Sequence, residues 1–254
     1  MISIITVVYN DLQGIKRTYE SLLEYNGLKF EWVVVDGNSN DGTKEFLAET
    51  KPPFEYKYIS EPDKGLYDAM NKGIALGEEE YLLFLNAGDM ISKKNIIKDL
   101  PGHGEIIVFN IETVNHNLEP SPQRGFKTST EYLKMYPSVP HQSTLIKRAV
   151  FDRIGDYSLD IRYLADYDFF CRAYVAGVDF YFVPEETFSI FVQDGISSNL
   201  KSASILKNES KRIQKKYFGK INRSWIFELT LKSFISSIPY SSKIIAISRK
   251  WIFR

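Results

Sequence analysis

Cysteine is almost absent from this 254-residue sequence, and long apolar runs are absent altogether. The single cysteine, Cys171, permits no intramolecular disulfide and no thiolate metal cluster, which is typical of a protein from a reducing cytoplasm. No apolar run approaches the roughly 18 to 20 residues that span a bilayer. The first nine residues have the pattern of a strand and lack the basic start of a signal peptide. We therefore expect a cytoplasmic protein.

Glycine-rich phosphate-binding motifs are missing as well. The sequence contains neither a P-loop nor a Gly-x-Gly-x-x-Gly fingerprint. A nucleotidyltransferase would need a basic, glycine-rich loop after its first strand to wrap a triphosphate, whereas the corresponding loop here is Tyr9-Asn10-Asp11-Leu12. This argues against that enzyme class. The hydrophobic content of 44% excludes a disordered chain.

The formal net charge is zero, but the two signs are separated along the chain. Residues 199–254 contain 13 Lys or Arg and only two acidic residues, whereas residues 1–198 contain 19 basic and 30 acidic ones. Such a basic segment is either a solvated helix surface or a surface attracted to anionic lipid headgroups, where each Lys or Arg contributes about 1 kcal/mol. The aliphatic, aromatic and cationic end at 244–254 is typical of an interfacial helix, but packing on the core or in a dimer would suit it equally. Nothing else in the chain favours a nucleic-acid partner.

Hydrophobic strands followed by polar loops dominate the first hundred residues. Residues 2–10 and 31–43 each begin as a β-branched or apolar run and end in Asp and Asn. Residues 80–89 are a buried-strand pattern that ends on Asn-Ala-Gly-Asp, and residues 60–73 form a turn that opens into a helix. Because ligands bind outside the carboxyl ends of strands in open α/β sheets, we expect these loops to form one site.

Helical spacing of apolar residues between these strands indicates βαβ units. The fold class predicted is therefore α/β, with a mixed, mainly parallel sheet flanked by helices and a basic helical C-terminal extension. We expect one domain over residues 1–198, divided into a nucleotide-binding half (1–100) and an acceptor half (101–198). Residues 199–254 are expected to form a basic amphipathic helical tail.

The order of these motifs resembles that of inverting family 2 glycosyltransferases with the Rossmann-like GT-A fold, especially those that build bacterial surface polysaccharides. The resemblance covers roughly residues 1 to 200. It implies transfer of a sugar from a nucleotide diphosphate sugar, with a UDP-sugar as the default donor, to a saccharide acceptor. The basic tail suggests that this acceptor is lipid-linked and that the enzyme contacts the anionic inner face of the plasma membrane.

The resemblance also implies roles for particular residues on the donor side. Thr6 and Tyr9 would lie beside the base and ribose, and Asp36 would accept a hydrogen bond from the base. Many relatives have two adjacent aspartates at this point, but this chain has glycine after Asp36. Lys64 would contact the diphosphate or ribose, and Asn86 would offer a neutral oxygen to the nucleotide.

The expected metal ligand is Asp89, which would hold Mn²⁺ or Mg²⁺ against the diphosphate. Relatives commonly have Asp-x-Asp-Asp here, whereas this chain has Asn86-Ala87-Gly88-Asp89. One protein carboxylate still suits Mg²⁺ or Mn²⁺, because such ions often bind chiefly through substrate phosphates. Because this motif has fewer carboxylates, it predicts weak metal binding without nucleotide.

On the acceptor side, Asp166 matches the general base of the family, with Ala165 where a glutamate is common. Asp168 is an alternative base, although it lies about 200° further around the helix. His141 is expected to bind the diphosphate or the acceptor. Residues 194–198 resemble a loop that closes over the donor, and their composition also suits a linker.

Each of these residues also has a purely structural interpretation. Thr6 and Tyr9 are common in strands, Asp36 and Lys64 suit turns, and Asp89 and Asp166 suit helix starts. The main alternative to the enzyme is therefore a non-catalytic saccharide-binding or scaffold protein with a degenerate site.

Overall fold

A computed structural model describes residues 1–95, 97–121, 125–193 and 202–236. Within them, eight strands form one sheet in the order β3-β2-β1-β4-β7-β6-β8-β5. The strands are β1 (Ile2–Val8), β2 (Phe30–Asp36), β3 (Glu55–Ser60), β4 (Tyr81–Phe84), β5 (Met90–Ile91), β6 (Ile106–Val114), β7 (Thr144–Lys147) and β8 (Phe180–Val192). The α-helices are α1 (Leu12–Leu23), α2 (Thr43–Glu49), α3 (Leu66–Leu76), α4 (Arg148–Ile154), α5 (Ala165–Val175), α6 (Ala203–Phe218) and α7 (Arg223–Ser236), and the short 3₁₀ helices are η1 (Thr130–Lys134) and η2 (His141–Ser143).

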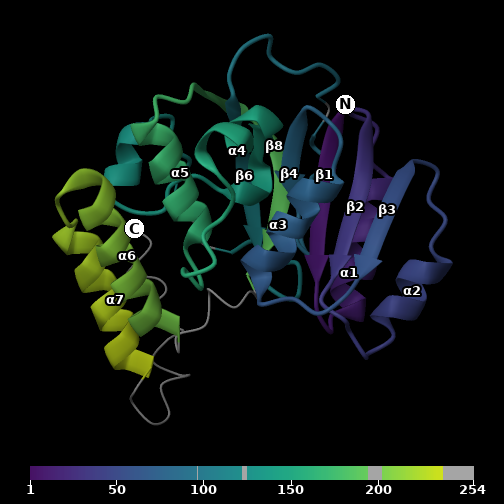
Figure 1. Cartoon of the computed structure of the whole chain (residues 1–254), viewed down its shortest axis with the longest axis horizontal. Coiled ribbons are helices and arrows are strands. Elements are labelled where there is room, and N and C mark those ends of the chain that lie inside the picture. Colours follow the sequence, from purple (N-terminus) through teal and green to yellow (C-terminus); the bar gives the residue numbers. More distant parts are fainter. Residues whose placement is uncertain (96, 122–124, 194–201, 237–254) are drawn as a thin grey trace.

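The first half of the sheet is parallel. β1 lies between β2 and β4, β3 pairs with the outer side of β2, and all three pairings are parallel. The crossovers α1, α2 and α3 connect successive strands, so the carboxyl ends of β1 to β4 reach the same edge (Figure 1). This arrangement confirms the predicted α/β class and brings the predicted polar loops to one edge.

The second half is mixed. β7 is antiparallel to both β4 and β6, while β6 is parallel to β8 and β5 is antiparallel to β8. β8 has 13 residues, and a break in register near Phe109 and Asn110 lets it follow all of β6. The 3₁₀ turn His141–Ser143 immediately precedes β7, which begins at Thr144. That turn directs His141 to the sheet edge.

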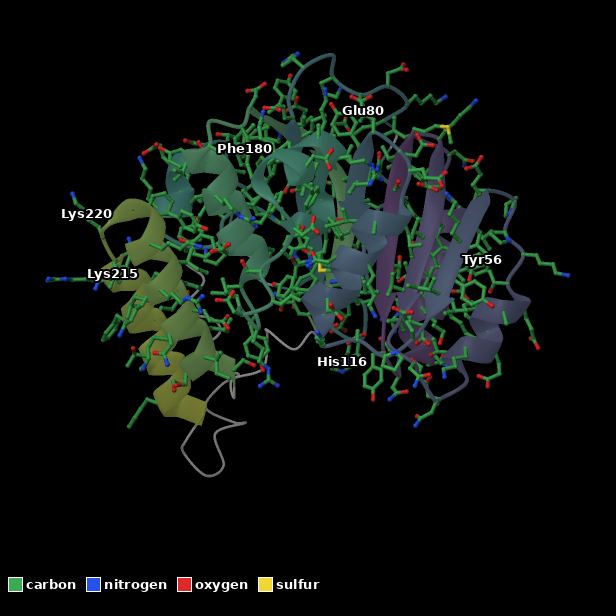
Figure 2. The ribbon with its side chains drawn as sticks, viewed as in Figure 1. Tyr56, Glu80, His116, Phe180, Lys215 and Lys220 are labelled. Atoms are coloured by element: carbon green, nitrogen blue, oxygen red, sulfur yellow. The ribbon has the colours of Figure 1, made fainter. Side chains whose placement is uncertain are left out.

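Helices α6 and α7 form a hairpin at one end of the molecule, beyond α5 (Figure 1). Lys215 and Lys220 point outward from this hairpin, away from the sheet (Figure 2). No helix of the described ranges is both long and apolar enough to cross a bilayer. The loop predicted to close over the donor (194–198) and the interfacial segment (244–254) lie outside the described residues, so these expectations and the domain boundary at 198 stay predictions.

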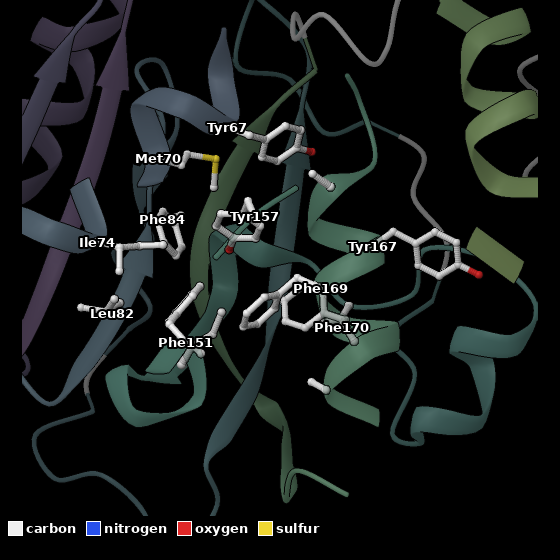
Figure 3. Close-up of a cluster of buried hydrophobic side chains, with 14 of the residues drawn as sticks. Tyr67, Met70, Ile74, Leu82, Phe84, Phe151, Tyr157, Tyr167, Phe169 and Phe170 are labelled. Carbon is white, nitrogen blue, oxygen red and sulfur yellow. The ribbon is translucent and has the colours of Figure 1, made fainter. Parts of the chain in front are cut away.

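Two apolar clusters cover the faces of the sheet. One packs side chains of α1 and α2 against Trp32 and its neighbours, and the other packs α3, α4 and α5 against the opposite face. Aromatic side chains dominate the second cluster, where Phe84, Phe151 and Phe169 surround Tyr157 (Figure 3). This packing fixes α3 and α5, the two helices that carry side chains to the candidate site.

Helix α3 lies so close to β1 that only glycine fits at one contact. A Cβ atom on Gly73 would lie 2.3 Å from Cγ2 of the fully buried Ile5. We expect Gly73→Ala to lower the free energy of unfolding by about 1 kcal/mol, because overpacking costs about 1–3 kcal/mol and the gain in helix propensity is about 1 kcal/mol. Gly102→Ala, where no atom lies within 4 Å, is the control. Urea unfolding that shows equal stability for both variants would contradict this packing.

Candidate active site

Three predicted site residues from distant parts of the chain form a hydrogen-bonded series at the end of β4. Asn86 follows β4, His141 opens η2, and Asp166 lies in the first turn of α5. His141 Nδ1 is 2.9 Å from Asp166 Oδ2, and His141 Nε2 is 3.5 Å from Asn86 Nδ2. The side chains of His141 and Asp166 are 12% and 18% exposed, so both reach solvent at this edge.

Tyr67, which the sequence did not single out, completes this series. Its hydroxyl lies 3.1 Å from Asp166 Oδ1 and 2.9 Å from the carbonyl oxygen of Tyr163. Burial, and next the negative charge of Asp166, raise the pKa of Tyr67 well above its ordinary value, so this hydroxyl keeps its proton and serves as a donor. The only signal in the sequence is its position, two residues after the Asp63-Lys64-Gly65 turn.

Asp89 lies in the turn that follows β4 and is 4% exposed. Its Oδ1 accepts a hydrogen bond from the backbone N–H of Val192, 3.2 Å away on β8. Burial raises the pKa of Asp89 to about 7, although that N–H, the positive potential of His141 and the side chain of Gln142 act in the opposite direction. The predicted metal ligand therefore lies in a poorly hydrated corner beside His141.

The turn that carries Asp89 requires the glycine that replaces a family carboxylate. Gly88 has a φ of +94°, a left-handed conformation in which a side chain would be strained. Its N–H donates to Thr18 Oγ1 over 3.0 Å, and the same hydroxyl donates to the carbonyl oxygen of Asp89 over 2.7 Å. Gly88, where relatives commonly have an aspartate, therefore suits the left-handed backbone of this turn.

The corner between Asn86 and Asp89 has the chemistry of a site for a hard cation. Asn86 Oδ1 is buried and has no hydrogen-bond partner among the described residues. Amide and carboxylate oxygens are ligands that Mg²⁺ and Mn²⁺ prefer. The described ranges contain no group of three His, Cys, Asp or Glu side chains that could hold a metal ion. The residues present fit a cation that takes its remaining ligands from phosphate and water.

The donor-side residues lie where the loops after β1, β2 and β3 meet. The ring of Tyr9 is 66% exposed, and a Cβ on Gly37 would lie 3.1 Å from this ring and 2.4 Å from the carboxylate of Asp63. Lys64 is exposed, and its backbone N–H donates to Asp68 over 2.9 Å. Tyr9 and Lys64 are thus the exposed members of this donor-side surface, Asp63 is partly exposed, and Gly37 is buried beneath them.

Asp36 lies beneath this surface and is fully buried. Its carboxylate accepts hydrogen bonds from the hydroxyls of Ser39 and Ser60 and from the N–H of Ser39. These contacts hold the loop after β2 against β3. The hydrogen bond from a nucleotide base to Asp36 stays a prediction.

Two predicted residues are not brought into the site. Thr6 is fully buried, and its hydroxyl accepts a hydrogen bond from Trp32 Nε1 over 2.9 Å. Its side chain therefore points to the face of the sheet that α1 and α2 cover. Asp168 is also buried, and its carboxylate faces Tyr217 and Lys216 of α6 at 3.0 and 3.4 Å. The structure thus places neither side chain in the hydrogen-bonded series, and the contacts of Thr6 with the base and of Asp168 with the acceptor stay predictions.

Comparison with known families and sequences gives consistent results. A sequence model of glycosyl transferase family 2 matches residues 3–154. An uncharacterised glycosyltransferase of Mycobacterium tuberculosis is 33% identical over 187 residues, which cover 68% of each chain. A PGL/p-HBAD biosynthesis glycosyltransferase of Mycobacterium bovis is 28% identical over 182 residues, which cover 68% of this chain and 70% of the relative.

Solved structures share the fold at lower sequence identity. Residues 1–349 of S. aureus TarS in complex with UDP align with a TM-score of 0.64 and 18% identity, covering 98% of this chain and 78% of TarS. The mannosyltransferase PcManGT from Pyrobaculum calidifontis, in complex with GDP-Man and Mn²⁺, gives a TM-score of 0.64 at 14% identity, covering 100% of this chain and 80% of PcManGT. The GT-A-like fold expected from the sequence is thus confirmed.

The raised pKa of Asp89 predicts a pH-dependent stability of the metal-free protein. Because the folded state binds this proton more tightly than the unfolded state, the contribution is fully present near pH 4 and is lost as the pH rises through about 7. We expect wild type in EDTA to lose about 2 kcal/mol relative to Asp89→Asn between pH 5 and pH 8, measured by urea unfolding. Parallel pH profiles for the two proteins would contradict the burial of this carboxyl.

Proposed function

The chain belongs to glycosyltransferase family 2, an inverting family, and from this premise we propose that it transfers a sugar from a UDP-sugar to a saccharide acceptor with the help of Mn²⁺ or Mg²⁺. The observation that carries this proposal is the Asp166 carboxylate, which remains accessible while Tyr67 and His141 hold it. It lies in the same hydrogen-bonded series as Asn86, in the turn that carries Asp89. The proposed base for the acceptor hydroxyl therefore lies next to the side-chain oxygens proposed to hold the cation against the donor diphosphate.

The proposed reaction is a single in-line displacement. The acceptor hydroxyl attacks the anomeric carbon as the bond from this carbon to the diphosphate oxygen breaks, and Asp166 takes the hydroxyl proton. The leaving group is the nucleoside diphosphate, and an α-linked donor gives a β-linked product. Tyr67 and His141 direct the two carboxylate oxygens, which places the base before the substrate arrives.

Asp89 and Asn86 would hold the divalent cation through their side-chain oxygens. When bound, this cation stabilises the negative charge that develops on the departing diphosphate. Because Asp89 is 4% exposed, little water reaches its carboxylate, and a cation bound there would be attracted more strongly than in bulk water.

A UDP-sugar is the first candidate donor because TarS, which shares the fold, was crystallised with UDP and with UDP-GlcNAc. PcManGT was crystallised with GDP-Man, so the fold accepts more than one base. Tyr9 and Lys64 would contact the nucleotide from the exposed donor-side surface. Asp36 would act from beneath it.

A lipid-linked saccharide is the proposed acceptor, which would place the enzyme at the inner face of the plasma membrane. The M. bovis relative is named for PGL/p-HBAD biosynthesis. In this chain, Lys215 on α6 and Lys220 in the turn before α7 point outward (Figure 2). Phe227 on α7 is 70% exposed. Cationic and aromatic side chains are the groups that bind an anionic membrane interface.

Nucleotide binding tests the donor and the metal together. We expect one of UDP, GDP, dTDP and CMP to raise the melting temperature, with a further rise in Mn²⁺, because a ligand at 100 times its Kd stabilises a fold by about 2.7 kcal/mol. Asp89→Asn should remove only the Mn²⁺-dependent part, and Asp166→Asn should keep both parts while losing sugar transfer. No shift with any nucleotide would favour the degenerate, non-catalytic protein instead.

Membrane association is tested with vesicles. We expect wild type to co-sediment with vesicles that contain anionic phosphatidylglycerol and not with neutral ones. Lys215→Gln combined with Lys220→Gln should weaken binding about tenfold or more, since each cation contributes about 1 kcal/mol. Phe227→Ser should weaken it as well, whereas Leu159→Ser, a change of an exposed apolar residue outside the helix hairpin, is the control. Binding that none of these changes alters would contradict the proposed surface.

A further inference from the structure

Helix α6 reaches back to the loop that carries Asp166. The carboxylate of Glu209 accepts hydrogen bonds from three consecutive backbone N–H groups, those of Arg162, Tyr163 and Leu164, over 2.7, 3.1 and 3.1 Å. One oxygen accepts from Arg162 and the other from Tyr163 and Leu164. A single side chain thus fixes the segment immediately before α5.

This contact lies immediately before the first turn of α5, in which the N–H of Tyr167 donates to Asp166 Oδ1 over 2.8 Å. The N-cap residue of α5, Leu164, has no side chain that can accept a hydrogen bond from the first turn. The N–H groups at the start of a helix attract negative charge, and hydrogen bonds to a carboxylate are stronger than those to a neutral acceptor. Glu209 provides this charge from a different helix, more than forty residues later in the chain.

The peptide groups around Tyr163 are held from two sides. Glu209 accepts the N–H of Tyr163, and the hydroxyl of Tyr67 lies 2.9 Å from its carbonyl oxygen. The same hydroxyl is 3.1 Å from Asp166 Oδ1. The segment is therefore held by hydrogen bonds to Tyr67 of α3 and Glu209 of α6. A movement of the segment would change the hydrogen bond between Tyr67 and Asp166.

The position of Glu209 is itself fixed by the docking of α6. On α6, Tyr217 and Lys216 bind the carboxylate of Asp168, which lies on α5. Gln214, also on α6, donates to the carbonyl oxygen of Met135 over 2.9 Å. Glu209 is also one of only two acidic residues among 13 basic ones in residues 199–254. One of the two carboxylates of this basic segment therefore contacts the loop that leads to Asp166.

We propose that Glu209 is a positioning residue for sugar transfer, so that α6, which lies beyond the residues matched by the family model, completes the active site. This inference rests on the proposed role of Asp166 as the base. Glu209 touches no reacting atom; it acts through the backbone of residues 162–164, which sets where the Asp166 carboxylate lies. A displacement of about 1 Å at a catalytic group can lower a rate about a hundredfold.

The test compares Glu209→Gln and Glu209→Ala with Asp160→Asn, a change that removes an exposed ion pair between α6 and the same region. Three quantities are measured. They are the hydrogen exchange of peptides covering residues 160–170, the Kd of the nucleotide selected by thermal shift, and the rate (kcat) at which that nucleotide is released from the corresponding nucleotide sugar. We expect Glu209→Gln to lower kcat about tenfold, with a nucleotide Kd within about twofold of wild type and faster exchange at residues 162–164. Glu209→Ala should be slower still, because Gln keeps one acceptor oxygen, and Asp160→Asn should match wild type.

Each other outcome overturns the inference in a distinguishable way. Faster exchange with an unchanged kcat would show that Glu209 only stabilises the fold. An unchanged exchange rate, or an equal loss of kcat in Asp160→Asn, would show that the carboxylate does not hold the segment specifically. Wild type that binds nucleotide but transfers no sugar would overturn the proposed function and the positioning role together, while the exchange data would still report on the contact itself.

Discussion

The placement of one carboxylate, that of Asp166, is the constraint on which this end of the molecule depends. Tyr67 approaches it from α3, His141 from η2, and Glu209 fixes the backbone before it from α6. None of these elements is next to α5 in the sequence, where α4 precedes it and β8 follows it. The aromatic cluster under α3 and α5 keeps the donors at hydrogen-bond distance, so packing in the core decides the geometry at the surface (Figure 3).

Two carboxylates only two residues apart on α5 serve different purposes because they point in different directions. Asp166 is partly exposed and lies among polar groups at the sheet edge. Asp168 is 1% exposed and is compensated by the hydroxyl of Tyr217 and by the charges of Lys216 and Arg172. A buried carboxylate needs such partners, and here they come largely from α6. The same helix turn thus carries the proposed base and an anchor for the C-terminal hairpin.

Sequence patterns were sufficient for the α/β class, for the strands and helices of the first half of the sheet and for the edge at which the site lies. The apolar runs of β1, β2 and β4 and their polar endings predict a common edge, and Asn86, His141 and Asp166 do meet there. The direction of a side chain was harder to obtain. Thr6 lies on a predicted strand beside the predicted loops, yet the two-residue alternation of β1 turns it to Trp32.

Contacts between distant segments were beyond the reach of patterns. Glu209 has no motif, because its function comes from three backbone N–H groups that only the docking of α6 brings near. Gly88 looks in the sequence like the loss of a family carboxylate, whereas its φ of +94° is a left-handed conformation that favours glycine. The length of β8 likewise depends on a register break in β6, which leaves no sign in composition.

The approach of Asp63 to Gly37 makes these two positions interdependent. The space that a side chain at position 37 would occupy already holds the Asp63 carboxylate, 2.4 Å from the Cβ that glycine lacks. A side chain at position 37 would therefore have to displace the end of the Asp63 side chain. An engineer who restores the paired aspartates brings a second carboxylate against the first, so residues 37 and 63 are best changed together.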